Sequence, residues 1–212
     1  MTLRTTERFT IPGPAGALEL VCSAPAHAAC GIALIAHPNP MQGGTLDNKV
    51  VQTLARTFHG LGYASVRFNF RGVGASEGVF DRGIGETHDA LAALAYARTR
   101  FGARLPMVLA GFSFGCFVQA RVGREVAPQR LVLIAPAVGR FTLGAVPVDT
   151  LVVHGEEDDI VPLADVLAWA RPQGLPIVVF PGCGHFFHGW LPKLSATIAG
   201  NWHGAPPVVP GA

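Results

Sequence analysis

A serine lies between two glycines in the segment GFSFG, residues 111–115, where the sequence pattern changes. The run PMVLAGFS that leads to it is apolar enough for a buried strand, and a helical pattern begins near Phe114. A G-x-S-x-G turn between strand and helix lifts the serine hydroxyl above a sheet. We therefore expect Ser113 to be a nucleophile, and the backbone N–H of Phe114 to bind an oxyanion that forms beside it.

A serine hydroxyl is a weak nucleophile at neutral pH, so it requires a histidine base and a carboxylate that orients the histidine. The segment HGEEDDIVP, residues 154–162, contains four acidic residues, Glu156, Glu157, Asp158 and Asp159. The segment GHFFHG, residues 184–189, contains His185 and His188. The order serine, acid, histidine fits a strand-to-helix serine site. We favour His185 over His188, because His188 falls where the last helix is expected to begin.

Short apolar runs separated by helical patterns must position these residues. The runs are GIALIAHP, YASVRFNF, PMVLAGFS, RLVLIAPAV, TLVVHG and PIVVFPG, and each reads as a strand buried on both faces. Helical periodicity is found over residues 50–61, 90–101 and 191–198. This alternation predicts an α/β fold: a mostly parallel twisted sheet with helices on both faces and ligands beyond the carboxyl ends of the strands. The first 25 residues predict an antiparallel hairpin.

Length and composition favour one domain that acts on small molecules. A chain of 212 residues suits a single domain, which we expect over residues 1–203, with a disordered Pro- and Gly-rich tail over 204–212. The polar start lacks the features of a signal peptide, and no apolar run is long enough to span a bilayer, so a cytoplasmic protein is expected. A net charge of +2 without a basic run does not indicate a nucleic-acid-binding surface.

The four cysteines, Cys22, Cys30, Cys116 and Cys183, show neither metal-ligand spacing nor the density of a disulfide scaffold. We expect them to be reduced, and Cys116 and Cys183 to be small buried apolar residues. A metal bound by His185 and His188 would need a third ligand segment. No metal or organic cofactor is therefore expected.

Five segments follow one another as in a known superfamily: HPNPMQGGTLDNKVV, VRFNFRGVGASEG, GFSFG, HGEEDDIVP and GHFFHG. Over nearly its whole length the chain resembles the α/β-hydrolases, and among them the small capless bacterial serine hydrolases grouped with dienelactone hydrolase. The resemblance implies that Ser113 is the nucleophile, His185 the base and Asp158 the acid. The loop at residues 135–148, where the superfamily sometimes supplies its acid, has neither Asp nor Glu. Dienelactone hydrolases carry cysteine in place of Ser113, so their lactone substrate is not carried over.

A second oxyanion donor is expected in the loop after GIALIA. Pro38 and Pro40 have no N–H, which leaves Asn39 between them. Asn39 also matches the variable position of the superfamily's HGxP pattern. Because a proline replaces the usual glycine after the histidine of that pattern, Met41 and Gln42 remain alternative donors.

Several side chains are candidates to line the substrate site. Met41, Phe112 and Phe186 could form an apolar acyl pocket, as could Phe114 and Phe187, although aromatic residues beside such a site are as often part of the core. Arg71 could contact a substrate carboxylate, but an arginine that ties neighbouring loops together is the favoured interpretation.

These features predict a serine hydrolase that cleaves carboxylic esters, or thioesters, through an acyl-enzyme. The segment GRFTLGAVPVDT, residues 139–150, is too short for a helical lid, which favours short acyl chains. The alternatives are a peptidase or amidase of the same fold, and a non-catalytic ligand-binding member. The expected partner is a small-molecule ester, and either a monomer or a homodimer is compatible with the sequence.

Overall fold

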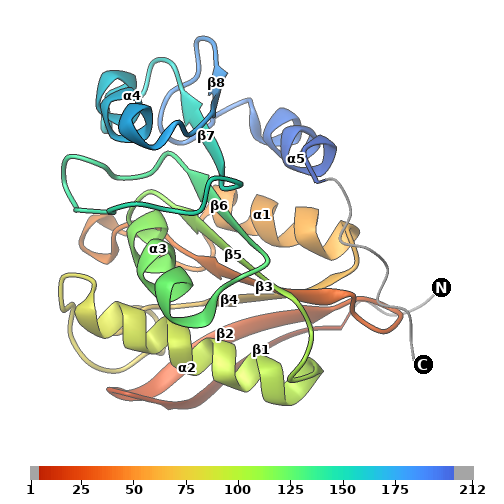
Figure 1. Ribbon diagram of the computed structural model, residues 1–212. Helices are drawn as coiled ribbons and strands as arrows, with labels where there is room; N and C mark the ends of the chain where they lie inside the picture. Colours follow the sequence, from red (N-terminus) through yellow and green to blue (C-terminus); the bar gives the residue numbers. More distant parts are fainter. Residues whose placement is uncertain (1–4, 203–212) are drawn as a thin grey trace.

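The computed structural model describes residues 5–202, which form one eight-stranded sheet flanked by helices (Figure 1). The predicted tail at 204–212 lies outside these residues. The strands are β1 (Thr5–Gly13), β2 (Gly16–Ala24), β3 (Gly31–Ala36), β4 (Tyr63–Phe68), β5 (Met107–Phe112), β6 (Arg130–Ile134), β7 (Leu151–Gly155) and β8 (Ile177–Phe180). The helices are α1 (Lys49–Gly60), α2 (Ile84–Phe101), α3 (Phe114–Val126), α4 (Leu163–Ala170) and α5 (Leu191–Gly200), with short 3₁₀ turns η1 (Pro40–Gln42) and η2 (Arg171–Gln173).

The strand order is β1-β2-β4-β3-β5-β6-β7-β8. β1 and β2 form the predicted hairpin, β2 pairs antiparallel with β4, and the strands from β4 to β8 are parallel. β3 has β4 on one side and β5 on the other, so the chain changes direction across the sheet at this point. Such a switch point leaves a crevice between the loops that follow two adjacent strands. The loops after β3 and β5 therefore lie next to each other.

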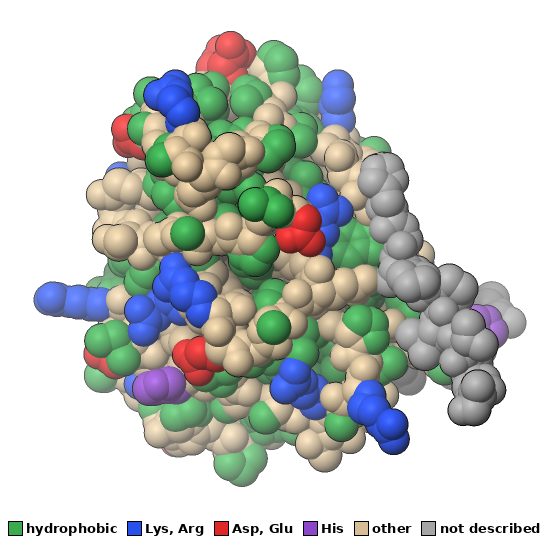
Figure 2. All heavy atoms as spheres, in the orientation of Figure 1, with side chains coloured by type: hydrophobic (Ala, Val, Ile, Leu, Met, Phe, Trp, Pro, Cys, Tyr) green, Lys and Arg blue, Asp and Glu red, His purple; other side chains and the backbone are tan. Residues whose placement is uncertain are grey.

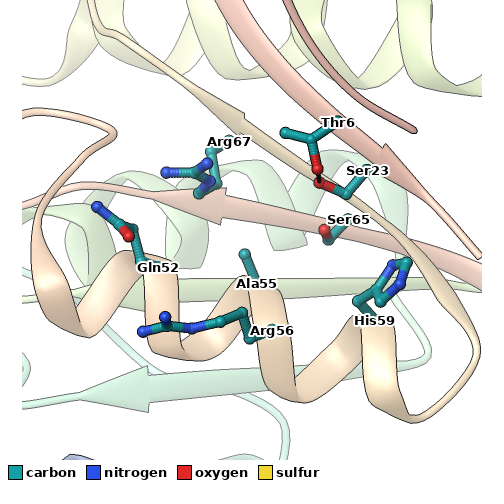
Figure 3. A pocket seen from close by; sticks show the side chains of 8 residues that line it. All are labelled: Thr6, Ser23, Gln52, Ala55, Arg56, His59, Ser65 and Arg67. Carbon is teal, nitrogen blue, oxygen red and sulfur yellow. Dashed lines mark hydrogen bonds between the residues drawn. The ribbon is translucent and has the colours of Figure 1, made fainter. Parts of the chain in front are cut away.

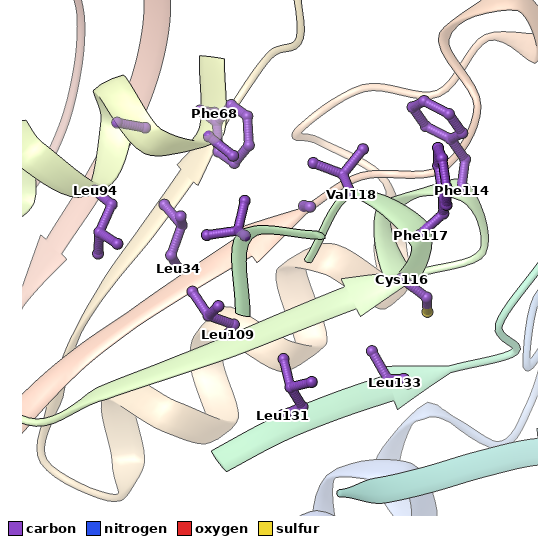
Figure 4. Packing of buried hydrophobic residues seen from close by; sticks show 14 of the residues in the cluster. Leu34, Phe68, Leu94, Leu109, Phe114, Cys116, Phe117, Val118, Leu131 and Leu133 are labelled. Carbon is purple, nitrogen blue, oxygen red and sulfur yellow. The ribbon is translucent and has the colours of Figure 1, made fainter. Parts of the chain in front are cut away.

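The sheet separates two hydrophobic cores. Helices α2, α3 and α4 bury apolar residues on one face, and α1 and α5 do so on the other. Neighbouring strand residues go to opposite cores: Leu34, Leu109 and Leu131 lie in one row in the core of α2, α3 and α4 (Figure 4), whereas Ile35 lies in the core of α1 and α5. Because both faces are covered, each central strand is a continuous apolar run, as predicted.

The segment between β6 and β7 forms turns and irregular backbone without a helix, in agreement with the prediction that the fold has no lid. The helix expected near the end of the chain is α5, with Pro192 in its first turn. Within residues 5–202, no helix combines the length and hydrophobicity that crossing a bilayer requires. On the face shown in Figure 2, Lys and Arg side chains are scattered among apolar and neutral ones and form no continuous basic stripe.

Candidate active site

Ser113 occupies the turn between β5 and α3 in a strained conformation, with φ of 55° and ψ of −116°. A positive φ is costly for a residue that carries a Cβ. Two backbone hydrogen bonds hold it: the Ser113 N–H donates to Ile134 O at 2.9 Å, and the Ser113 carbonyl accepts from Cys116 N at 3.0 Å. The turn therefore presents the Ser113 side chain at the carboxyl end of β5.

The two glycines of the segment are required by close backbone packing. A Cβ at residue 111 would lie 2.5 Å from the carbonyl carbon of Gly115. A Cβ at residue 115 would overlap the carbonyl oxygen of Ala36, at the end of β3. Gly115 thus lets the first turn of α3 approach β3, which brings the loop after β3 close to Ser113.

His185 and Asp158 form a buried pair contributed by the loops after β8 and β7. His185 Nδ1 lies 2.7 Å from Asp158 Oδ2, and the other carboxylate oxygen accepts from the N–H groups of Ile160 at 3.0 Å and Val161 at 2.7 Å. Burial by itself would raise the pKa of Asp158, but the hydrogen bonds from His185 and the Val161 amide lower it below its usual value. An ionised Asp158 can only accept, so the proton of His185 is on Nδ1 and Nε2 is left as a proton acceptor.

The neighbouring candidates are placed differently. Glu156, Glu157 and Asp159 are exposed, and Glu156 accepts a hydrogen bond from the backbone of Gly182. His188 is also exposed, in a turn that precedes α5. The expectation that the last helix has begun at His188 was wrong, because α5 begins at Leu191. Of the acids and histidines in these two loops, Asp158 and His185 are the ones that meet.

Ser113 and His185 line the same pocket, which has a volume of about 120 Å³. Asn39, from the loop after β3, and Phe186 also line it. All four residues follow carboxyl ends of parallel strands, at the edge where the switch point opens the sheet. The fold therefore brings together a serine, a histidine with its carboxylate, and the loop expected to bind an oxyanion.

Hydrogen bonds in the loop after β3 distinguish Asn39 from the alternative oxyanion donors Met41 and Gln42. The N–H of Met41 donates to Asn39 Oδ1 at 2.9 Å, and the N–H of Gln42 donates to Asn39 O at 3.0 Å. By contrast, the backbone N–H groups of Asn39 and Phe114 donate to no other residue within 5–202. Two unpaired amides beside the Ser113 turn are suited to bind a developing negative charge.

His37 holds this loop in place, a role that the sequence analysis missed. Its Nδ1 donates to Pro38 O at 2.7 Å, and its Nε2 accepts from the Phe70 N–H at 3.0 Å. Complete burial lowers the pKa of His37 to about 3, so the imidazole is neutral. The signal in the sequence was a histidine placed directly after a buried strand.

Of the six candidate lining residues, Phe186 is the one that lines the Ser113 pocket, and Phe114 and Phe187 are fully buried. Phe186 is 43% exposed and lines the pocket, as expected. Phe112 is fully buried and packs against the His185 ring with 5.0 Å between centroids, so it supports the imidazole instead of lining the pocket. Met41 is 70% exposed and borders a different groove, which it shares with Arg71.

Arg71 ties two segments together. Its guanidinium donates to both carboxylate oxygens of Asp89, at 2.8 and 3.0 Å, and to Gly85 O at 2.9 Å. Both partners belong to α2, so the arginine joins this helix to the loop after β4. This agrees with the interpretation favoured from the sequence. Asp89 occupies the Nε and Nη2 donors with which Arg71 would otherwise bind a substrate carboxylate in a bidentate manner.

All four cysteines are unpaired, and burial raises the pKa of Cys116 and raises that of Cys183 to about 11. Both thiols are therefore protonated at neutral pH and unsuited to act as nucleophiles. Among residues 5–202, no group of three or more His, Cys, Asp or Glu side chains is arranged to hold a metal ion.

Comparison with known proteins agrees with this geometry. Residues 41–143 match the family model Hydrolase_4, described as serine aminopeptidase, S33. That range contains Ser113 but ends before Asp158 and His185. The uncharacterized protein RP471 of Rickettsia prowazekii (strain Madrid E) is 34% identical over 212 residues, which cover 90% of this chain and 89% of that protein.

Solved structures share the fold over nearly the whole chain. An α/β serine hydrolase homologue from Coxiella burnetii is 38% identical, with a TM-score of 0.87 and coverage of 95% of this chain and 99% of that one. XC6422 from Xanthomonas campestris, described as an α/β serine hydrolase without a lid, is 35% identical, with a TM-score of 0.88 and coverage of 95% and 97%. The chain therefore belongs to the α/β-hydrolase superfamily, among the small serine hydrolases that lack a lid.

Proposed function

We propose that this hydrolase cleaves short-chain carboxylic esters through a covalent acyl-enzyme. The observation that carries the proposal is the buried pair of His185 and Asp158, 2.7 Å apart, whose histidine lines the same pocket as Ser113. A serine, a histidine and an ionised carboxylate that orients the histidine form the arrangement that activates a hydroxyl for acyl transfer.

In the proposed reaction the Ser113 oxygen attacks the ester carbonyl carbon while Nε2 of His185 takes the hydroxyl proton. The negative charge that forms on the carbonyl oxygen is bound by the N–H groups of Asn39 and Phe114, and each donor contributes about 3 kcal/mol. His185 then gives its proton to the departing alcohol. Water, deprotonated by His185, attacks the acyl-enzyme, the bond between the acyl carbon and the Ser113 oxygen breaks to release the acid, and His185 returns the proton to Ser113. Asp158 holds the imidazole in the Nδ1–H tautomer throughout.

The preference for short acyl chains is argued from the shape of the site. No helix lies between β6 and β7, where a lid would be inserted, and the pocket at Ser113 has a volume of only about 120 Å³. An acyl chain that extends beyond the pocket leaves methylenes in water, and each of these forgoes about 0.8 kcal/mol of apolar burial. We expect acyl groups of about two to six carbons, because each further methylene would gain little binding energy.

Rates on p-nitrophenyl acetate, butyrate, octanoate and palmitate test both parts of the proposal, with matching thioesters as a second series. Wild type should favour acetate or butyrate with ordinary saturation, and Ser113→Ala should be inactive on all of them. A fluorophosphonate probe should label wild type at Ser113. Labelling at another residue contradicts the mechanism, and a maximum at octanoate or longer contradicts the chain-length preference alone.

A peptidase or amidase is the second candidate, and the description of the matching family model as a serine aminopeptidase favours it. The same three side chains serve amide cleavage. Aminoacyl p-nitroanilides distinguish the two functions: an esterase should hydrolyse them far more slowly than p-nitrophenyl butyrate. Labelling of Ser113 without turnover of any ester or amide would instead favour a non-catalytic ligand-binding protein.

A further inference from the structure

A second pocket lies between α1 and the strands β4, β2 and β1, and it shares no lining residue with the pocket of Ser113 (Figure 3). Its volume is about 180 Å³. On this face of the sheet, β2 and β4 present Ser23, Ser65 and Arg67, while their apolar neighbours Cys22 and Val66 point into the opposite core. The hydrophobic alternation of these strands thus leaves a polar wall beside α1.

Two arginines give the pocket a positive charge. Arg67 has only 13% of its side chain exposed, and its Nη1 donates to Leu46 O at 2.7 Å and lies 3.4 Å from Asp47. Its Nε and Nη2 donate to no residue of the range 5–202. Arg56, on the exposed side of α1, forms no ion pair within the same range. The fork of Arg67 and the whole guanidinium of Arg56 are therefore available to a ligand.

The carboxylate that contacts Arg67 does not balance the charge of the two arginines. Asp47 is shared, since it also pairs with Arg8 at 2.5 Å, and Arg8 has a second partner in Glu19 at 3.2 Å. Burial lowers the pKa of Arg67, Asp47 opposes this, and the positive charges of Arg8 and Arg56 lower that pKa further. Arg56 and Arg67 line the same pocket, where their like charges repel, and an anion between them would relieve that repulsion.

Neutral hydrogen-bonding groups line the rest of the pocket. Thr6 and Ser23 share a hydrogen bond of 2.9 Å between their hydroxyls, while the buried His59 Nδ1 has no partner among the described residues. Figure 3 shows Arg67 at one end, His59 at the other, and Ser65 between them. The pocket therefore combines a cationic end with an end rich in hydroxyl and imidazole groups.

We propose that this pocket binds a small phosphate monoester that carries hydroxyl groups, with the phosphate between Arg56 and Arg67. A guanidinium group can donate two parallel hydrogen bonds to a pair of phosphate oxygens. The two positive charges of Arg56 and Arg67 match the double negative charge of a phosphate monoester better than the single charge of a carboxylate. The hydroxyls of the ligand would then meet Ser65, Ser23 and His59. A pocket of about 180 Å³ accommodates a phosphate and a few carbon atoms. Because no residue is shared with the Ser113 pocket, the proposal is independent of the proposed hydrolase activity.

Calorimetric titration at constant ionic strength with ribose 5-phosphate, inorganic phosphate, ribose and citrate tests the site. We expect saturable binding of ribose 5-phosphate, at least tenfold weaker binding of inorganic phosphate and citrate, and no measurable binding of ribose. Arg56→Gln should weaken ribose 5-phosphate binding at least tenfold. The matched control is Arg104→Gln, which removes the same charge from an exposed loop outside the pocket and should have no effect.

Ser65→Ala separates the two ends of the pocket. It should weaken ribose 5-phosphate binding several-fold and leave inorganic phosphate binding unchanged, because only the ester places hydroxyls near Ser65. The proposal is overturned if ribose 5-phosphate does not saturate, if Arg56→Gln and Arg104→Gln weaken binding equally, or if citrate binds as tightly as the phosphate ester. Ester hydrolysis by all three variants should equal that of wild type.

Discussion

Nε2 of His154 lies 3.4 Å from Oδ2 of Asp158, the same oxygen that is 2.7 Å from Nδ1 of His185. One buried carboxylate oxygen thus lies between two imidazoles. His154 is fully buried, and burial lowers its pKa, so it is neutral, with its Nε2–H directed to Val161 O at 2.9 Å. His154 is not among the candidates found in the sequence, and it helps to define where Asp158 can lie.

Asp158→Asn should lower kcat for p-nitrophenyl butyrate by about 10³- to 10⁴-fold, because an amide no longer selects the Nδ1–H tautomer of His185. Asp159→Asn, which changes an exposed neighbour, should stay within about twofold of wild type by the usual weakness of exposed charges. Steady-state kinetics of the two variants checks this. The opposite pattern would move the acid to Asp159.

His154→Gln should lower kcat about tenfold and leave KM unchanged, an effect of about 1.4 kcal/mol on the barrier. The reason is that Asp158 loses one neighbour but keeps the backbone donors Ile160 and Val161. The control is His188→Gln at an exposed turn, which should match wild type. If KM rises while kcat is unchanged, His154 does not act through Asp158.

Ser113→Gly should be more stable than wild type by about 1 kcal/mol, because glycine adopts a φ of 55° without the strain that a Cβ causes there. Ser113→Ala keeps the Cβ and should stay within about 0.5 kcal/mol of wild type. Both variants should be inactive. Urea unfolding of the three proteins measures the differences, and equal stability of all three would show that the turn is not strained.

Stability should fall as the pH is lowered from 7 to 4.5. The pKa of His37 is lowered to about 3 in the folded protein, whereas an unfolded histidine titrates near 6.5. The unfolded state therefore binds the extra proton in the window between these values, which costs about 2.5 kcal/mol by pH 4.5. His37→Gln should lose this part of the pH dependence, and His27→Gln, at an exposed position, should keep it. The same pH dependence in both variants would contradict the assignment.

The sequence by itself determined the strands, the helices and the turn at Ser113. These features depend on neighbours along the chain: apolar runs buried on both faces, helical periodicity, and two glycines that leave room for a sharp turn. The hairpin of β1 and β2 and the final helix α5 were predicted for the same reason. The order of serine, acid and histidine was also visible, because it is a property of the chain.

Only the tertiary structure decided between neighbouring residues of one type. Asp158 differs from Asp159 in being buried against His185, and Asn39 differs from Met41 in having an N–H that no described residue accepts. Met41 and Phe112 are candidates for an apolar acyl pocket because of their residue types and their positions beside the site in sequence, but Met41 is exposed at η1 and Phe112 is buried at the end of β5. Burial and hydrogen bonding depend on partners far away in the sequence, as does the packing of α1 against β4 that brings Arg56 and Arg67 into one pocket, and no local pattern records them.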